Sequence, residues 1–494
     1  MTLPRRFVAR SLITALAFGL CAPYVAGAQP AANQTPVVVP TPAPMPTTSG
    51  TPIPYPAYGT PAPDVAAQAQ KPGVPVTVTL KSAIDIAVAQ SPAFASERAA
   101  YYQIAAKYGA ARGALGPSLS ASGSVDRSWG RSLSGASPSP SSGPNSVNGY
   151  VTTEQGSVSV SQLIFDGGHL IEGLRSAQFA DVAGRDTLLR QLQTLAFTVA
   201  TNYYALLEDN AAVASDNSLV REFEINEQFV SAEIRTGAAP RSDLAAAQFE
   251  TAQARGALVT AQGNQIAAQA TFATSLGLDA DTLIQPTPLE ASPPQVKILS
   301  YQQALAEAFK LRPDFLAAQA TVDSNKANLL YAELGRVPTV TLNGSAGTGR
   351  DLVYPNAMTS WSPSGSIGAT ISLPIWDQGL TDYNIHVAKD QLDQAVAGLS
   401  TSRLQVQSDV RGGLAGLISA RANLVQAEAE VTSSTVSLQA TQAQYKVGAS
   451  TITAIVTAEA NLATAQTSYV QALYGERLAE QQYTYALGSS DLTL

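Results

Sequence analysis

Residues 366–376 of the chain read SIGATISLPIW, and the interpretation of the rest of the sequence starts from this stretch. Its odd-numbered positions, from Ile367 to Ile375, are all apolar. Its even-numbered positions, from Ser366 to Pro374, are all small or polar. A period of two over the whole segment is the pattern of a β-strand whose two faces meet different surroundings. We therefore predict a strand with one apolar face over 366–376.

The same alternation occurs earlier in the chain. Leu119, Ala121 and Val125 alternate with serines, and Val158 and Val160 do so as well. Alternating segments of about ten residues are typical of outer-membrane barrels, although an ordinary half-buried hairpin gives the same local pattern. No amphipathic segment lies nearby to cover the apolar face, which favours the membrane interpretation. The predicted hairpins enclose loops rich in Ser, Gly and Pro at 128–149 and 347–364.

The chain repeats itself in tandem. Pro92 and Pro117 recur at the same spacing as Pro313 and Pro338. Further matched pairs follow in the same order: Phe165 with Trp376, Asp166 with Asp377, Gly237 with Gly448 and Gly277 with Gly488. The first copy contains a short insertion between Ser124 and Phe165, where a hairpin loop would tolerate it. Self-similarity over so long a stretch indicates a duplicated fold.

Each copy contains the same series of predicted elements. A helix with an early proline comes first, then the hairpin, then a very long helix, a turn with a glycine and a returning helix. The predicted helices are 82–114, 169–235, 242–275, 302–335, 380–446 and 451–486. The longest of them would extend on the order of 100 Å, which is typical of coiled coils rather than of globular domains. Their Ala, Gln, Ser and Thr content allows close helix packing and lacks a sustained Leu heptad.

Two hairpins supply only four strands, which are too few to close a barrel with a lumen. A barrel would therefore be assembled from several chains, and three chains would supply twelve strands. No segment after the N-terminus gives about 18 consecutive apolar residues, so no ordinary transmembrane helix is predicted there. A spanning structure without such helices has to be a closed barrel, because only helices and barrels satisfy every backbone group in lipid.

The two turns after the long helices carry the candidate functional residues. Arg235 and Lys446 fall in last helical turns, where a cation complements the helix dipole. Gly237 and Gly448 can adopt the left-handed conformation that ends a helix. Ser242 in the first copy, and Ser450 or Thr451 in the second, are the predicted N-caps of the returning helices. The plain structural interpretation is a capped turn without a partner.

The N-terminus has the features of a secretory signal. Arg5, Arg6 and Arg10 precede a short apolar run at 11–20, and Ala26-Gly27-Ala28 is a small-residue cleavage site. We predict a signal peptide over 1–28 and a proline-rich, disordered tether over 29–75. Cys21 would leave with the signal, since Leu20 before it is not the small residue that lipoprotein processing prefers. Whether Cys21 is ever lipidated stays open.

Composition argues against several other functions. Charged residues are 13% of the chain, well below the roughly 25% of ordinary soluble domains, and a membrane-embedded part would explain this. A net charge of −8 argues against nucleic acid. One cysteine and two histidines argue against a disulfide framework and a metal centre. No cofactor motif or catalytic constellation is recognised, so we expect neither a cofactor nor an enzyme.

From about residue 76 onward, the chain resembles the TolC family of outer-membrane efflux proteins. The resemblance is carried by LRPDF at 311–315, GPSLS at 116–120, LPIWDQG at 373–379, and the turns at 235–237 and 446–448. Each motif alone is weak, whereas together in a duplicated frame they are specific. We place the first efflux repeat at 76–279, a linker at 280–297 and the second repeat at 298–494.

The resemblance implies a mixed α and β membrane protein. Its expected form is a homotrimer, with a twelve-stranded β-barrel in outer-membrane lipid continuous with a periplasmic α-helical barrel. Such proteins contribute no catalysis. They dock a periplasmic membrane-fusion adaptor and an inner-membrane pump of the RND or ABC type. Drug efflux and type I secretion share this architecture, and neither the substrate nor the particular pump can be read from the sequence.

By the same resemblance, the two glycine turns are the periplasmic tip where the adaptor docks. The docking residues are Arg235, Thr236, Gly237, Ala238, Lys446, Val447, Gly448 and Ala449. Arg241 and Asp243 are the candidate pore gate. Some relatives carry acidic residues at the second tip, where this chain has Ala454 and Thr457, so an ionic gate does not transfer directly. The alternative to a duct is a periplasmic adaptor-like coiled-coil protein, which would show a single hairpin and no duplication.

Overall fold

The computed structural model describes most of the chain after the predicted tether. The described residues are 76–132, 147–237, 240–288, 296–354, 357–358 and 360–489. All of them belong to one unit of the chain, Ala57–Leu494. The predicted signal peptide at 1–28 and the predicted tether at 29–75 lie outside the described residues, as do 133–146 of the first predicted loop.

Eight α-helices are described, four in each copy of the duplication. The helices of the first copy are α2 Leu80–Gln90, α3 Pro92–Gly113, α4 His169–Thr236 and α5 Arg241–Ser275. Those of the second copy are α6 Tyr301–Leu311, α7 Pro313–Glu333, α8 Leu380–Lys446 and α9 Ile452–Leu487. A 3₁₀ turn, η1 Leu334–Arg336, follows α7. The long helices α4 and α8 have 68 and 67 residues, which confirms the predicted 169–235 and 380–446 to within one residue.

The predicted single helices 82–114 and 302–335 were wrong, because each divides in two at its proline. Pro92 and Pro313 are the first residues of α3 and α7. Proline lacks the N–H that a helix interior requires, but its fixed φ suits the first helical turn. Ser91 caps α3, and its Oγ accepts a hydrogen bond of 3.4 Å from the Phe94 N–H.

The strands form two sheets. They are β1 Val76–Val78, β2 Ser118–Ser132, β3 Val147–Phe165, β4 Ile284–Pro286, β5 Thr339–Tyr354, β6 Ala357–Met358 and β7 Ser362–Ser372. Within the predicted linker 280–297, β4 pairs in parallel with β1. The larger sheet is antiparallel in the order β2-β3-β5-β7, with the short β6 also paired to β5.

Two strand boundaries differ from the predictions. The strand predicted over 366–376 ends at Ser372, two residues before Pro374, which cannot donate a ladder hydrogen bond. The predicted loops 128–149 and 347–364 were too long, because β2 continues to Ser132 and β5 to Tyr354. Part of the serine and glycine assigned to the loops therefore belongs to the strands.

The register of the larger sheet confirms its two chemically different faces. Leu119 lies opposite Val160, which lies opposite Gly344, which lies opposite Ile367. On the other face the hydroxyl groups pair across the strands: Ser120 with Ser159 at 2.8 Å, Ser122 with Ser157 at 3.0 Å and Ser345 with Ser366 at 2.9 Å. We call this set the hydroxyl ladder.

The connections from strand to long helix are built alike in the two copies. Asp166 accepts hydrogen bonds from the N–H groups of Gly168 at 3.0 Å and Leu170 at 2.6 Å. Asp377 accepts the equivalent bonds from Gly379 at 3.1 Å and Thr381 at 2.8 Å. In each copy a carboxylate thus takes up N–H groups that the first helical turn leaves without a partner.

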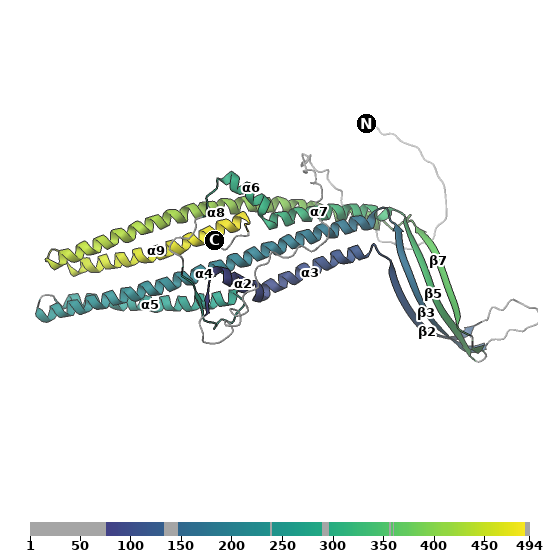
Figure 1. Ribbon diagram of the computed structural model, residues 1–494, viewed down its shortest axis with the longest axis horizontal. Helices are drawn as coiled ribbons and strands as arrows, with labels where there is room; N and C mark the ends of the chain where they lie inside the picture. The colour runs from purple at the N-terminus through teal and green to yellow at the C-terminus, as the bar shows by residue number, and fades with distance from the viewer. Residues whose placement is uncertain are drawn as a thin grey trace, which may run out of the picture. The chain divides into compact units, whose positions relative to one another are not determined.

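The long helices pair as two antiparallel hairpins. Figure 1 shows α4 beside α5 and α8 beside α9, and helix–helix contacts also join α4 to α9 and α7 to both α4 and α8. The core of the first copy lies where α2, α4, α5 and β4 meet, and includes Ile86, Tyr203 and Phe272. No helix in the described part of the chain has an apolar stretch long enough to cross a membrane.

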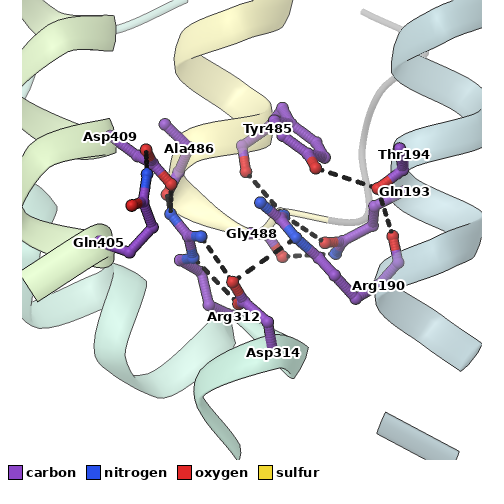
Figure 2. Close-up of polar contacts among 10 residues, drawn as sticks. All are labelled: Arg190, Gln193, Thr194, Arg312, Asp314, Gln405, Asp409, Tyr485, Ala486 and Gly488. Atoms are coloured by element: carbon purple, nitrogen blue, oxygen red, sulfur yellow. Dashed lines mark hydrogen bonds and ion pairs between the residues drawn. The ribbon is translucent and has the colours of Figure 1, made fainter. Parts of the chain in front are cut away.

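The arginine of the LRPDF motif holds the end of α9 in place. Arg312 is only 1% exposed, and its guanidinium donates to Asp314 at 2.6 and 3.0 Å and to Asp409 on α8 at 2.8 Å (Figure 2). It also donates to the Ala486 carbonyl at 3.4 Å. Burial acts to raise the pKa of Asp314, but the hydrogen bonds from Arg312 and the charge of Arg190 hold it below the usual value.

Helix α4 of the first copy reaches the same point. Arg190 donates to the Tyr485 carbonyl at 3.1 Å and stacks on the Tyr485 ring with its guanidinium carbon 3.7 Å from the ring centre. Gln193 donates to the Gly488 carbonyl at 2.9 Å (Figure 2). Since the carbonyl end of a helix is negative, two guanidinium groups there satisfy both its charge and its open acceptors.

We expect Arg312→Ala to destabilise the protein by roughly 3–5 kcal/mol, because it removes the buried guanidinium that is hydrogen-bonded to Asp314, Asp409 and the Ala486 carbonyl. The matched control is Lys326→Ala on α7, the helix that begins directly after Arg312; it breaks an i,i+3 pair with Asp323 in which both side chains are about one-third exposed. That change should cost only about 0.2–0.5 kcal/mol. Thermal melts of the purified variants in detergent measure both, and equal melting temperatures would contradict the role given to Arg312.

Candidate functional site

The second turn, between α8 and α9, is a Schellman motif. Gly448 has φ +73°, its N–H donates to the Tyr445 carbonyl at 2.9 Å, and the N–H of Ala449 donates to the Gln444 carbonyl at 2.9 Å. These two bonds satisfy carbonyls that the end of α8 leaves open. A Cβ at Gly448 would meet nothing within 4 Å. The requirement for glycine there is therefore conformational rather than steric.

The returning helix α9 begins as predicted. Thr451 is its N-cap, and the Thr451 Oγ1 accepts a hydrogen bond of 3.3 Å from the Ala454 N–H. Of the two residues left open by the sequence, the cap is thus Thr451 and not Ser450. The side chain of Lys446, the last residue of α8, is not described.

The first turn ends α4 in the same left-handed way. Gly237 has φ +78°, and its N–H donates to the Ile234 carbonyl at 3.1 Å. Thr236 Oγ1 donates to the Glu233 carbonyl at 2.9 Å, and Arg235 lies in the last turn of α4. Ala238 lies outside the described residues.

The prediction that Ser242 caps α5 was wrong. Pro240 is the N-cap residue and supplies no side-chain hydrogen bond. Because the helix already includes Arg241, Ser242 stands inside its first turn and donates instead to the Asp243 carboxylate at 3.2 Å. Arg241 is exposed and Asp243 is half-buried. The charge of Asp243 acts on Tyr445 of the other hairpin.

The contact that joins the two turns was not found from the sequence. The Tyr445 hydroxyl on α8 donates to the Glu233 carboxylate on α4 at 2.8 Å. Burial, together with the hydrogen bond to Glu233 and the charges of Glu233 and Asp243, raises the pKa of Tyr445 to about 12. The phenol therefore keeps its proton at physiological pH and remains a donor. In the sequence, the one indication of this contact is that Tyr445 directly precedes the predicted turn residue Lys446.

An apolar cluster lies behind this contact and spans both hairpins. Val230 and Ala247 of the first hairpin pack with Leu438, Ile452 and Ile455 of the second. Buried apolar contacts of this kind give the hydrogen bond a fixed frame. The structure thus brings the two predicted turn regions together. The hydrogen bond between Tyr445 and Glu233 and the apolar cluster join them.

The acidic residues near the two turns are dispersed. Among the described residues, no group of three or more His, Cys, Asp or Glu side chains is arranged to hold a metal ion. The positions Ala454 and Thr457 lie in the first turns of α9, and the next acidic residue of that helix, Glu459, is buried against α4. The sequence analysis did not single out Glu459.

Comparison with known proteins places these features in a family. The outer membrane efflux protein family matches residues 83–278 and 301–489, which fall in the two copies of the duplication. The outer membrane efflux protein BepC of Brucella suis biovar 1 (strain 1330) is 27% identical over 354 residues, covering 70% of this chain and 75% of that protein. Protein CyaE of Bordetella pertussis is 28% identical over 350 residues, covering 70% of each.

Solved structures agree on the fold. The CmeC outer membrane channel of Campylobacter jejuni superimposes with a TM-score of 0.71 at 16% sequence identity, over 83% of this chain and 85% of that one. The resemblance to TolC is confirmed, and the family is one of outer-membrane channels rather than enzymes. With both copies of the duplication matched, the chain belongs to the outer membrane efflux protein family and is a protein of the outer membrane.

Proposed function

We propose that three copies of this chain form an outer-membrane exit duct. The observation that carries the proposal is the sheet β2-β3-β5-β7, whose outer strands β2 and β7 each have one long partner strand among the described residues. All its pairings are antiparallel, so β7 of one copy can pair with β2 of the next in the same sense. Twelve strands close a barrel with a lumen, and four do not.

The two faces of the sheet support a position in lipid. On the apolar face Leu119 and Ile371 are each 72% exposed and Ile367 is 82% exposed. Exposing large aliphatic side chains to water in a row is unfavourable, whereas hydrocarbon accommodates them. The hydroxyl ladder on the opposite face would then line the lumen, where a polar surface is required.

The helical hairpins α4–α5 and α8–α9 would form the periplasmic tube, in two repeats at 76–279 and 298–494 joined by the linker 280–297. In this arrangement the turns at 235–238 and 446–449 dock a membrane-fusion adaptor, which links the duct to an inner-membrane RND or ABC pump. The signal peptide 1–28 and the tether 29–75 complete the proposed organisation. An adaptor-like role is disfavoured, because an adaptor would not need two copies of hairpin and strands.

The tip would be closed at rest by contacts between the hairpins. Tyr445 and Glu233 join α8 to α4 within one chain, and opening the tube requires these helices to separate. Three copies of Asp243, with Arg241 beside each, would surround the narrow mouth and attract cations.

The proposed assembly predicts a trimeric mass. Native mass spectrometry of the purified protein in mild detergent should give three copies of the chain, since an open four-stranded sheet with exposed apolar residues is not stable alone. A stable monomer under the same conditions would contradict a barrel assembled from three chains.

We expect Gly448→Val to impair export while the trimer still reaches the outer membrane. A β-branched residue at φ +73° strains the turn by roughly 1–2 kcal/mol, although the site has space for its side chain. Gly416→Ala, within α8 and also open around its Cβ, is the control and should export normally. Export assays in cells that lack the native protein measure both. Normal export by the valine variant would contradict the proposal that this turn docks the adaptor.

Tyr445→Phe should raise the conductance of the resting channel in planar bilayers. Loss of the hydroxyl removes the bond to Glu233, worth about 1 kcal/mol in each copy. Tyr383→Phe is the control, because Tyr383 is 69% exposed near the start of the same helix. If Tyr445→Phe leaves the resting conductance unchanged, this contact does not hold the tip closed.

A further inference from the structure

A buried carboxyl group lies on the seam between the two hairpins, on the far side of Tyr445 from the turns. Glu459 on α9 is only 9% exposed, between the buried residues Ala458 and Leu462 of the same helix. Asn226 on α4 contacts it, with an Nδ2–Oε2 distance of 3.4 Å. One long hydrogen bond is poor compensation for taking a carboxylate out of water.

A cavity of about 330 Å³ adjoins this carboxyl group. Three helices line it: α4 with Glu222, Ile225, Asn226 and Phe229, α8 with Gln442 and Tyr445, and α9 with Ile455 and Glu459. Tyr445 thus borders the cavity with its ring and reaches Glu233 with its hydroxyl. Glu459 and the tyrosine of the contact that joins the turns therefore border the same cavity.

The charged groups that act on Glu459 have the same sign. Burial, together with the charges of Glu222 on α4 and Glu250 on α5, raises the pKa of Glu459 to about 7. Helix α8 contributes Gln442, which is neutral, and Tyr445, whose pKa of about 12 keeps it neutral as well. Near neutral pH the carboxyl group is therefore divided between its two forms.

We propose that Glu459 is a proton-controlled latch between the hairpins: its neutral form packs in the seam, and its ionised form drives α9 away from α4. This inference rests on the proposed duct, since it concerns the opening of the tip. The ionised carboxylate gains water and distance from Glu222 and Glu250 when the seam opens. The neutral acid loses little by staying packed.

The direction of the pH dependence follows from proton binding. In the packed state Glu459 holds its proton up to about pH 7, whereas in an open, solvated state it would titrate near the ordinary 4.5. Between these values the packed state binds more protons, so raising the pH favours opening. The ratio of open to closed channels should rise by up to about tenfold per pH unit for each copy, and become constant above neutral pH.

Planar-bilayer conductance of the purified protein at pH 5.5, 6.5, 7.5 and 8.5 tests the latch. The native channel should open more readily as the pH rises toward 7.5, and Glu459→Gln should stay in its low-pH behaviour throughout. Glu222→Gln removes one like charge and should move the midpoint to lower pH. Glu428→Gln, on an exposed position of α8, should leave the native profile unchanged. A profile that Glu459→Gln does not alter would overturn the proposal.

A spectroscopic distance provides a readout that does not depend on conduction. Spin labels at Gln228→Cys on α4 and Ala460→Cys on α9, both exposed positions, in a Cys21→Ser background report the width of the seam. The distance should increase from pH 5.5 to 8.5 and stay constant when Glu459→Gln is added. A constant distance in the native background would overturn the latch. Absence of conductance at every pH, with a distance that still widens, would count against the duct alone.

Discussion

The buried guanidinium of Arg312 is the interaction on which the arrangement of the helices depends. It joins α7 to α8 through Asp409 and to the end of α9 through the Ala486 carbonyl. Arg190 brings α4 to the same helix end. A helix of 36 residues whose last turn is fixed has its other end positioned as well, and that other end carries Ile452 and the second turn. The pairing of Tyr445 with Glu233 therefore presupposes a junction more than twenty residues away along α9.

The two copies repeat the same order of helices but differ in the side chains at equivalent positions. Gly277 and Gly488 both have positive φ, and a Cβ at either would meet backbone atoms at 2.7 Å, of Gln90 in the first copy and of Arg312 in the second. Yet the first copy has Ser91 where the second has Arg312. The first junction closes with a cap and an apolar core around Phe272, and the second closes with ions. The partners of Arg312 all belong to the second copy, and Arg190 of the first copy joins the repeats by donating to the Tyr485 carbonyl beside them.

How much of this could be predicted follows from the range of each interaction. The long helices, the strand faces and the turn glycines are local patterns, and the predicted limits of α8 agree with the structure. The helix boundaries at Pro92 and Pro313 are also local, since proline favours the first turn of a helix, but the prediction placed both prolines inside longer helices. Ser242 lost its capping role because Pro240 starts the helix earlier. Tyr445, Glu233, Glu459 and the partners of Arg312 lie far apart in the sequence, and no periodicity reports which of them meet. The docking and gating roles of the turns stay predictions.

The hydroxyl ladder has a consequence for whatever moves along that face of the sheet. In each of its pairs one serine hydroxyl donates to the other, as between Ser120 and Ser159, so one of the two hydrogens is already used. A surface with part of its hydrogen bonding satisfied internally offers a passing solute less in exchange for its own water shell. Such a surface is hydrated but binds solutes weakly. Solutes of different chemistry would then interact with this face of the sheet weakly and to a similar degree.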